Sequence, residues 1–140
     1  MNIPFITNPD KTISHNDGGE INVFDLNNIN NFSCKRIYYV DSGNLSISRG
    51  RHAHKKLEQV MICIKGKCNI TIINQNNQKY EFTLTEDTEP LFVPKLHWRE
   101  YQLHEKSTLL VLASEMYYEK DYIHNFNDFL NFENTIPTNK

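Results

Sequence analysis

Eight short segments rich in Ile, Val, Tyr and Phe follow one another at near-regular spacing, and this succession is what most restricts the fold. We expect strands at residues 35–40, 45–48, 59–64, 69–73, 79–84, 90–93, 98–103 and 108–113. Turn residues, mainly Gly, Asn, Asp and Ser, separate several of these segments, as they do between antiparallel strands. Short strands with almost no helical periodicity between them predict an all-β fold, an antiparallel sandwich or barrel.

Only the two ends of the chain depart from this pattern. Over residues 119–132 the apolar side chains from Tyr122 to Leu130 recur at helix-like intervals, which predicts a short C-terminal helix. The first thirty residues are polar and irregular, with one short strand expected at residues 20–24. No repeat or linker divides the chain, so we expect one domain over residues 1–140.

Composition and charge argue against two classes of partner. Fifteen basic and seventeen acidic residues give a net charge of -2, whereas binding to nucleic acid or to a membrane surface needs a concentrated basic face. No apolar run approaches the roughly twenty residues that span a bilayer. Residues 1–5 lack a basic segment followed by an apolar one, so we expect no secretory signal and a cytoplasmic protein.

Two histidines form the candidate site. Residues two apart on a strand point to the same side, so His52 and His54 project together. Imidazoles that face the inside of a small barrel are costly unless they bind, pair or react with something. Glu58 follows four residues later, and this spacing is the first half of the metal site of cupin barrels.

The second half of such a metal site is altered. It needs another histidine five residues after a proline, and here Arg99 stands five residues after Pro94. A guanidinium does not lose its proton and does not bind a cation, so we expect no metal. His97, two residues away on the same strand face, is the one residue that would restore the site.

The run from Arg49 to Gln59, Arg-Gly-x-His-Ala-His-Lys-Lys-Leu-Glu-Gln, resembles the signature of the dTDP-4-keto-6-deoxyglucose 3,4-ketoisomerases, a cupin family. Residues 35–40 are similar to the preceding strand of that family, and residues 94–100, 111–115 and 121–123 to its later landmarks, in order. The resemblance covers roughly residues 34 to 130. Family members often carry an Arg-Gly step near Gly18-Gly19, linked to the configuration at carbon 4; this chain lacks the arginine, which leaves the product open.

The resemblance implies a cupin-type jelly-roll barrel with a short C-terminal helix. It also implies an isomerase that converts dTDP-4-keto-6-deoxy-D-glucose to a 3-keto-6-deoxyhexose without a cofactor. The context it implies is deoxyamino-sugar synthesis for surface polysaccharide, such as the O-antigen of lipopolysaccharide. The family forms homodimers with exchanged N-terminal strands, and the segment at residues 20–24 is a candidate for such pairing.

The reaction moves a ketone by one carbon through an enediol or enediolate. A histidine, with an unperturbed pKa near 6.5, is able to accept and return the proton. We interpret His52 as the base at carbon 3, and His54 as the residue that orients the sugar or relays the proton between the oxygens. Arg49 would stabilise the charge on the enediolate oxygen.

Four more residues are candidates for substrate binding. Arg99 would stabilise the same charge or bind the pyrophosphate. Trp98 or Tyr38 would stack on thymine or pack against the sugar, although either also fits a core position. Lys56, inside the signature run, completes the set.

Three other functions stay open at this point. A 3,5-epimerase also removes protons beside a ketone, but its histidine–aspartate pattern is not visible in the sequence. A metal-dependent cupin enzyme would carry stoichiometric metal, and a non-catalytic sugar-binding cupin would bind without proton exchange. His15, His104 and His124 lie in polar stretches, where we expect them to be solvated.

Overall fold

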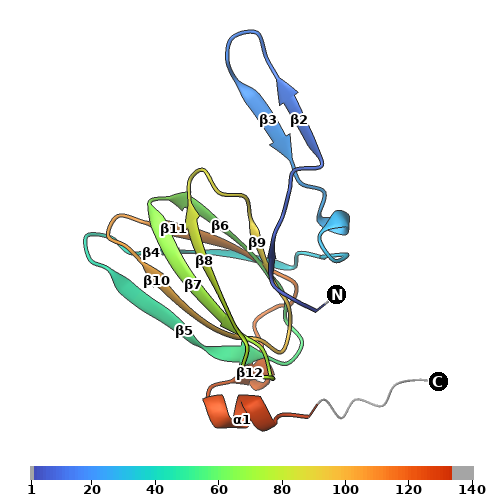
Figure 1. The fold of residues 1–140 in the computed structure, drawn as a ribbon, viewed down its shortest axis with the longest axis vertical. Helices are drawn as coiled ribbons and strands as arrows, with labels where there is room; N and C mark the ends of the chain where they lie inside the picture. Colours follow the sequence, from blue (N-terminus) through green and yellow to red (C-terminus); the bar gives the residue numbers. More distant parts are fainter. Residues whose placement is uncertain (1, 134–140) are drawn as a thin grey trace, which may run out of the picture.

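Two five-stranded antiparallel sheets face each other and form the body of the molecule (Figure 1) in the computed structural model, which describes residues 2–133. The first sheet has the order β1 (Phe5–Ile6), β9 (Leu91–Val93), β6 (Gln59–Lys65), β11 (Thr108–Ala113) and β4 (Arg36–Asp41). The second has the order β12 (Tyr122–Ile123), β5 (Ile47–His54), β10 (Trp98–Leu103), β7 (Lys67–Ile73) and β8 (Lys79–Thr85). The predicted all-β fold of cupin type is confirmed.

The space between the sheets changes from apolar to polar along the strands. On β10 the side chains of Arg99, Tyr101 and Leu103 point inward. The residues that alternate with them, Glu100 and Gln102, are exposed. On β6 the inward side chains run from Gln59 to Met61 and onward into the apolar core. One end of the barrel therefore holds a packed core, and the other end holds buried polar groups.

The N-terminal segment forms a hairpin that stands away from the barrel (Figure 1). The hairpin consists of β2 (Lys11–Ser14) and β3 (Glu20–Val23), which pair with each other, and a short 3-10 turn, η1 (Leu26–Asn28), follows it. Every residue of β2 is exposed. The strand expected at residues 20–24 is therefore present, whereas β1 and β2 were not predicted.

The predicted C-terminal helix over residues 119–132 is too long. A 3-10 turn, η2 (Glu119–Asp121), and the strand β12 come first, and the helix α1 is confined to Phe126–Asn131. The cause is tertiary pairing, because β12 hydrogen-bonds to the end of β5 and so cannot be helical. Asn125 caps the helix by accepting a hydrogen bond from the Asp128 N–H at 2.9 Å. Within residues 2–133 no helix has the length and apolar character needed to cross a membrane.

Candidate active site

A bulge in β5 sets the positions of the side chains before the two histidines. Across the neighbouring strand, Arg99 pairs with His52 and the next residue pairs with Gly50, so Arg51 is the extra residue. Gly50 and Arg51 both have positive φ, 91° and 63°. Because of the inserted residue, Arg49 lies on the same face of β5 as His52. Without it, the alternation of side chains along the strand would place the two residues on opposite faces. The Arg49 side chain itself is exposed at the edge of the barrel.

Gly50 is required at this bulge, and Gly50→Ala is predicted to destabilise the protein by about 2 kcal/mol or more. A Cβ at this position would lie 2.8 Å from the backbone oxygen of Arg99, and the φ of 91° is unfavourable for any residue with a side chain. Gly18→Ala is the matched control, because Gly18 has a φ of 95° but open space around it. Urea unfolding of both variants checks the prediction; equal losses would show that the close approach to Arg99 has no cost.

The two histidines and one tyrosine form a cluster of rings at the polar end of the barrel. The rings of His52 and His54 meet edge to face, with centroids 4.9 Å apart. Tyr122 of β12 lies 4.9 Å from the ring of His52 and 4.3 Å from that of His54. The prediction that the two histidines project together is therefore met by the geometry.

Asp121 holds one of these imidazoles. The Nδ1 atom of His54 lies 2.9 Å from the Oδ2 atom of Asp121, 67 positions later in the chain, and only 1% of His54 is exposed. The backbone N–H groups of Lys56 and Leu57 donate to the same carboxylate at 2.8 and 3.4 Å. Burial raises the pKa of Asp121, but these hydrogen bonds outweigh it and lower the pKa overall. A histidine–aspartate pair, not visible in the sequence, is thus present.

Both imidazoles are neutral at neutral pH. Burial, together with the positive charge of Arg99, lowers the pKa of His52 to about 3 and that of His54 to about 4. The hydrogen bond to Asp121 opposes this shift at His54 without cancelling it. Neutral imidazoles have a free lone pair, so either ring is able to take a proton from a substrate.

These lowered pKa values predict a loss of stability in mild acid. In the unfolded chain both histidines bind protons near pH 6.5, whereas in the folded chain they do not. The free energy of unfolding is therefore not lowered by these histidines above pH 6.5, and it falls as the pH drops toward 4. The expected slope is on the order of 1 kcal/mol per pH unit for each histidine. Urea unfolding between pH 7 and pH 4.5 measures it, and His52→Asn should show a shallower decline. Parallel declines in the two proteins would contradict the assignment.

Arg99 lies inside the barrel and is fully buried. It donates one hydrogen bond to the side-chain oxygen of Gln59 and another to the backbone oxygen of His97, at 3.0 Å. Burial lowers its pKa to about 10, so the guanidinium keeps its charge at neutral pH. Because none of the guanidinium is exposed, its position favours the stabilisation of charge beside the two histidines over contact with a pyrophosphate.

Tyr38 faces the same interior from β4. Its hydroxyl accepts a hydrogen bond of 2.8 Å from the Nε2 atom of Gln59. The guanidinium of Arg36 lies over its ring at 5.4 Å, and also 5.9 Å from the ring centroid of Tyr117. Tyr38 is therefore brought to the site as expected, whereas Gln59 was not anticipated.

Two predicted substrate-binding residues lie outside the histidine cluster. Trp98 is on the opposite face of β10 from Arg99, and its ring packs against Phe126 and Phe129 of α1 at 5.2 and 5.9 Å. Its position is that of a core residue under the helix. Lys56 is exposed, and its Nζ atom lies 3.6 Å from a carboxylate oxygen of Glu115.

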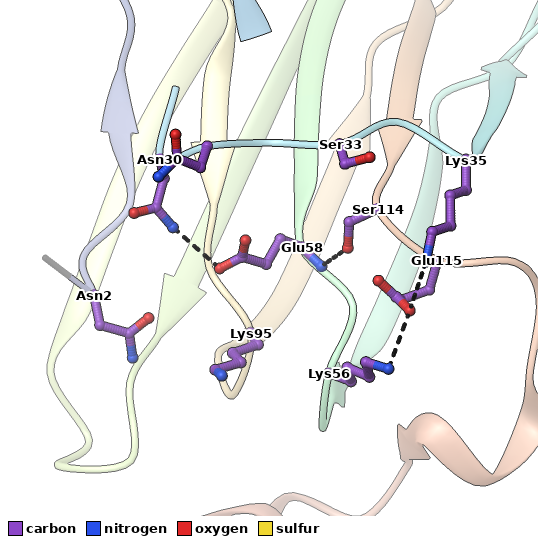
Figure 2. A pocket seen from close by; sticks show the side chains of 10 residues that line it. Asn2, Asn30, Ser33, Lys35, Lys56, Glu58, Lys95, Ser114 and Glu115 are labelled. Atoms are coloured by element: carbon purple, nitrogen blue, oxygen red, sulfur yellow. Dashed lines mark hydrogen bonds and ion pairs between the residues drawn. The ribbon is translucent and has the colours of Figure 1, made fainter. Parts of the chain in front are cut away.

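Glu58 does not join the histidines. It faces a separate cleft of about 620 Å³ (Figure 2), where its carboxylate accepts a hydrogen bond of 3.3 Å from Asn30. His97 is also turned away, with its Nδ1 atom 2.8 Å from the backbone oxygen of Lys95. The ligand set suggested by the spacing is therefore not assembled, and over residues 2–133 no group of three or more His, Cys, Asp or Glu side chains gathers in a way that could hold a metal ion.

A third histidine stands at the edge of the cluster. His124 is exposed, as expected, but its ring stacks on Tyr122 at 5.3 Å and lies 6.2 Å from the ring of His52. Its Nε2 atom is 2.9 Å from the carboxylate of Glu119. The apolar spacing of this segment predicted a helix, so it did not place Tyr122 and His124 beside His52; they reach the site through the pairing of β12 with β5.

A cupin-type barrel with one buried and one half-buried neutral imidazole beside a buried guanidinium is suited to an enzyme that works by acid–base chemistry. Residues 6–134 match the family FdtA, described as WxcM-like, C-terminal. The chain belongs to this family. Its similarity to enzymes named as sugar 3,4-ketoisomerases makes it a nucleotide-sugar ketoisomerase.

Three relatives are similar over most of their length. A TDP-4-oxo-6-deoxy-α-D-glucose 3,4-oxoisomerase from Aneurinibacillus thermoaerophilus is 41% identical over 101 residues, 70% of each chain. The crystal structure of a 3,4-ketoisomerase from Helicobacter canadensis is 36% identical, covers 91% of this chain and 94% of its own, and has a TM-score of 0.76. A 3,4-ketoisomerase from Thermoanaerobacterium thermosaccharolyticum, solved in complex with TDP, is 32% identical, covers 91% and 92%, and has the same TM-score of 0.76.

A more distant structure supports the fold alone. The dTDP-4-dehydrorhamnose 3,5-epimerase from Bacillus anthracis is 15% identical, covers 85% of this chain and 76% of its own, and has a TM-score of 0.72. Its likeness agrees with the barrel described above.

Proposed function

We propose that this chain converts dTDP-4-keto-6-deoxy-D-glucose to the corresponding 3-keto-6-deoxyhexose. The observation that supports this most strongly is the pair His52 and His54, held neutral at the polar end of the barrel beside the charge of Arg99. The substrate comes from the name of the 41% identical oxoisomerase and from the TDP complex of a related ketoisomerase. In this proposal the product serves deoxyamino-sugar synthesis for surface polysaccharide, and the cytoplasmic location stays a prediction.

The proposed reaction begins at carbon 3 of the sugar. His52 takes the proton from carbon 3, the electron pair of that bond forms the carbon 3–carbon 4 double bond, and the ketone oxygen gains negative charge. The positive charge of Arg99 stabilises this enediolate in a site of low dielectric constant. A proton passes from the hydroxyl on carbon 3 to the oxygen on carbon 4, the imidazolium of His52 returns a proton to carbon 4, and the ketone forms at carbon 3. His54, oriented by Asp121, holds the sugar oxygens in place.

The nucleotide part of the bound substrate is proposed to lie outside the histidine cluster, across the rim of the barrel. A hollow of about 310 Å³ beside Asp121 is lined by Lys56 and by the exposed ring of Tyr117, among others. A lysine suits a diphosphate, and an exposed ring suits the face of a nucleobase. Arg49, on the other side of the cluster, is proposed to bind the substrate from the exposed edge of β5.

A homodimer is part of this proposal. The outer face of β4 carries Ile37 and Tyr39, of which 64% and 68% are exposed, and the β2–β3 hairpin carries exposed Ile13 and Ile21. Exposed apolar side chains gathered on sheet faces and edge strands favour contact with a second copy. Sedimentation velocity of the purified chain tests this: a species of twice the chain mass supports the dimer, and a monomer at micromolar concentration rules it out.

The reaction itself is tested with purified protein and dTDP-4-keto-6-deoxyglucose after treatment with a chelator. We expect the 3-keto sugar to form at the same rate before and after chelation, because every group in the proposed steps belongs to the chain. Activity that is lost on chelation and restored by a divalent ion would instead favour a metal-dependent cupin enzyme. Binding of the substrate without any turnover would favour a sugar-binding protein.

A further inference from the structure

An exposed imidazole stands beside the half-buried His52. His124 directly follows β12, the strand that pairs with the end of β5, and its side chain is exposed. The ring centroids of His52 and His124 lie 6.2 Å apart. The ring of Tyr122 packs against both, stacked on His124 at 5.3 Å and lying 4.9 Å from His52. His124 therefore connects the region of the proposed base with the solvent.

A carboxylate fixes the tautomer of His124. The Nε2 atom of His124 lies 2.9 Å from one oxygen of Glu119, and the other oxygen accepts a hydrogen bond of 2.7 Å from the hydroxyl of Tyr117. The hydrogen bonds from Tyr117 and from His124 lower the pKa of Glu119, so it is a carboxylate at neutral pH. A carboxylate only accepts, so Nε2 of the neutral ring carries the proton and Nδ1 keeps its lone pair. Glu119 is also placed to stabilise the imidazolium that forms when Nδ1 takes a proton.

The proton that His52 takes from carbon 3 is held weakly. Burial and the charge of Arg99 lower the pKa of His52 to about 3, so its imidazolium readily gives the proton up. The sugar must contact the His52 ring for this proton to be removed, and it excludes water from that side of the ring. On the side of His124, the distance between the two rings is one that a single water molecule bridges.

We propose that His124, held by Glu119, is a proton relay between His52 and the solvent. After His52 has taken the proton from carbon 3, its imidazolium passes that proton through a water molecule to Nδ1 of His124, and the exposed imidazolium of His124 releases a proton to the solvent. A solvent proton returns to His52 by the same route, and His52 delivers it to carbon 4. All three side chains end as they began. His124 acts through His52 and does not touch the reacting carbons, and this inference rests on the proposed function.

The sharpest test is His124→Gln, because the amide of glutamine still donates to Glu119 but has no basic lone pair. The reaction is run in deuterated water with unlabelled dTDP-4-keto-6-deoxyglucose and stopped at early conversion, and the deuterium and protium at carbon 4 of the product are measured. We expect the ratio of deuterium to protium to fall about tenfold, because the proton from carbon 3 now stays on His52 and returns to carbon 4. The value of kcat should stay within about threefold of wild type, since His52 still removes and returns a proton.

His104→Gln is the matched control, because it makes the same change at the apolar end of the barrel, where His104 follows Leu103. It should leave both the ratio and kcat unchanged. Glu119→Gln is the second variant; it should lower the ratio in the same direction, because an amide neither fixes the tautomer of His124 nor stabilises its imidazolium. The double variant should lower the ratio no further than His124→Gln alone. Circular dichroism checks that each variant folds.

The outcomes separate the relay from the reaction itself. A wild-type ratio in folded His124→Gln would overturn the relay and leave the ketoisomerase proposal intact. A loss of kcat of about 100-fold or more in that variant would also overturn it, because His124 would then act on the substrate directly. Protium at carbon 4 in the product of the wild-type protein would show that no exchange takes place, with the same consequence. Failure of the wild-type protein to isomerise the substrate at all would overturn both proposals.

Discussion

Replacing His52 with asparagine is expected to lower kcat by about 10³-fold while leaving the fold intact. Asparagine is close to imidazole in size and fills the same half-buried position, but it has no basic lone pair to take the proton from carbon 3. Binding should change little, because the rings of Tyr122 and His54 that pack beside His52 are kept. Single-turnover measurements with dTDP-4-keto-6-deoxyglucose give kcat, and nucleotide titration gives the affinity.

The control for this variant is His104→Asn. His104 follows Leu103 at the apolar end of the barrel, where its Nε2 atom lies 3.0 Å from the amide of Asn69, and its replacement should leave turnover unchanged. A rate for His52→Asn within tenfold of wild type would show that His52 is not the base. Full loss in His54→Asn together with retained activity in His52→Asn would transfer the role to His54.

Replacing Arg99 with methionine is expected to lower kcat by about 100-fold and to move the acid limb of the kcat/KM profile to higher pH. The enediolate loses the nearest fixed positive charge, and such charges in a closed site contribute several kcal/mol to the transition state. The pKa values of His52 and His54 rise, because the guanidinium helps to hold both down. The pH profile of kcat/KM separates the two effects.

Arg99→Lys serves as the comparison, because a lysine keeps the charge but does not form the same pair of hydrogen bonds to Gln59 and to the His97 backbone. We expect its acid limb to stay near that of wild type even if kcat falls. An unchanged acid limb in Arg99→Met would mean that burial alone sets the histidine pKa values.

The strands of the two sheets were predictable because their sequences carry enough β-branched and aromatic residues. The exceptions are β1 and β12, which were not predicted, and β5, which was expected to end at residue 48 and extends to His54. Residues 49–54 are basic and contain a glycine, so they have no strand-like composition; pairing with β10 makes them a strand. The same kind of tertiary pairing shortened the C-terminal helix, since the apolar residues of β12 fit a helical interval but join the sheet.

The site was predictable only where neighbours in sequence are neighbours in space. His52 and His54 follow from the period of two residues along a strand, but Asp121 meets His54 across 67 positions, and no local spacing predicts that contact. Arg49 reaches the right face only because of the bulge at Gly50. Trp98, for which a core position was the alternative, lies next to Arg99 on β10 and so points to the opposite face, where α1 covers it.

The most direct measurement of the central claim is proton NMR of dTDP-4-keto-6-deoxyglucose with the chelator-treated protein in deuterated water. We predict a 3-keto sugar that carries deuterium at carbon 4, because the proton passes through His52 and exchanges with solvent before it is returned. The configuration at carbon 4 is read from the same spectrum. A substrate spectrum that stays unchanged, with no deuterium at carbon 3, would contradict the assignment of these histidines to ketoisomerisation.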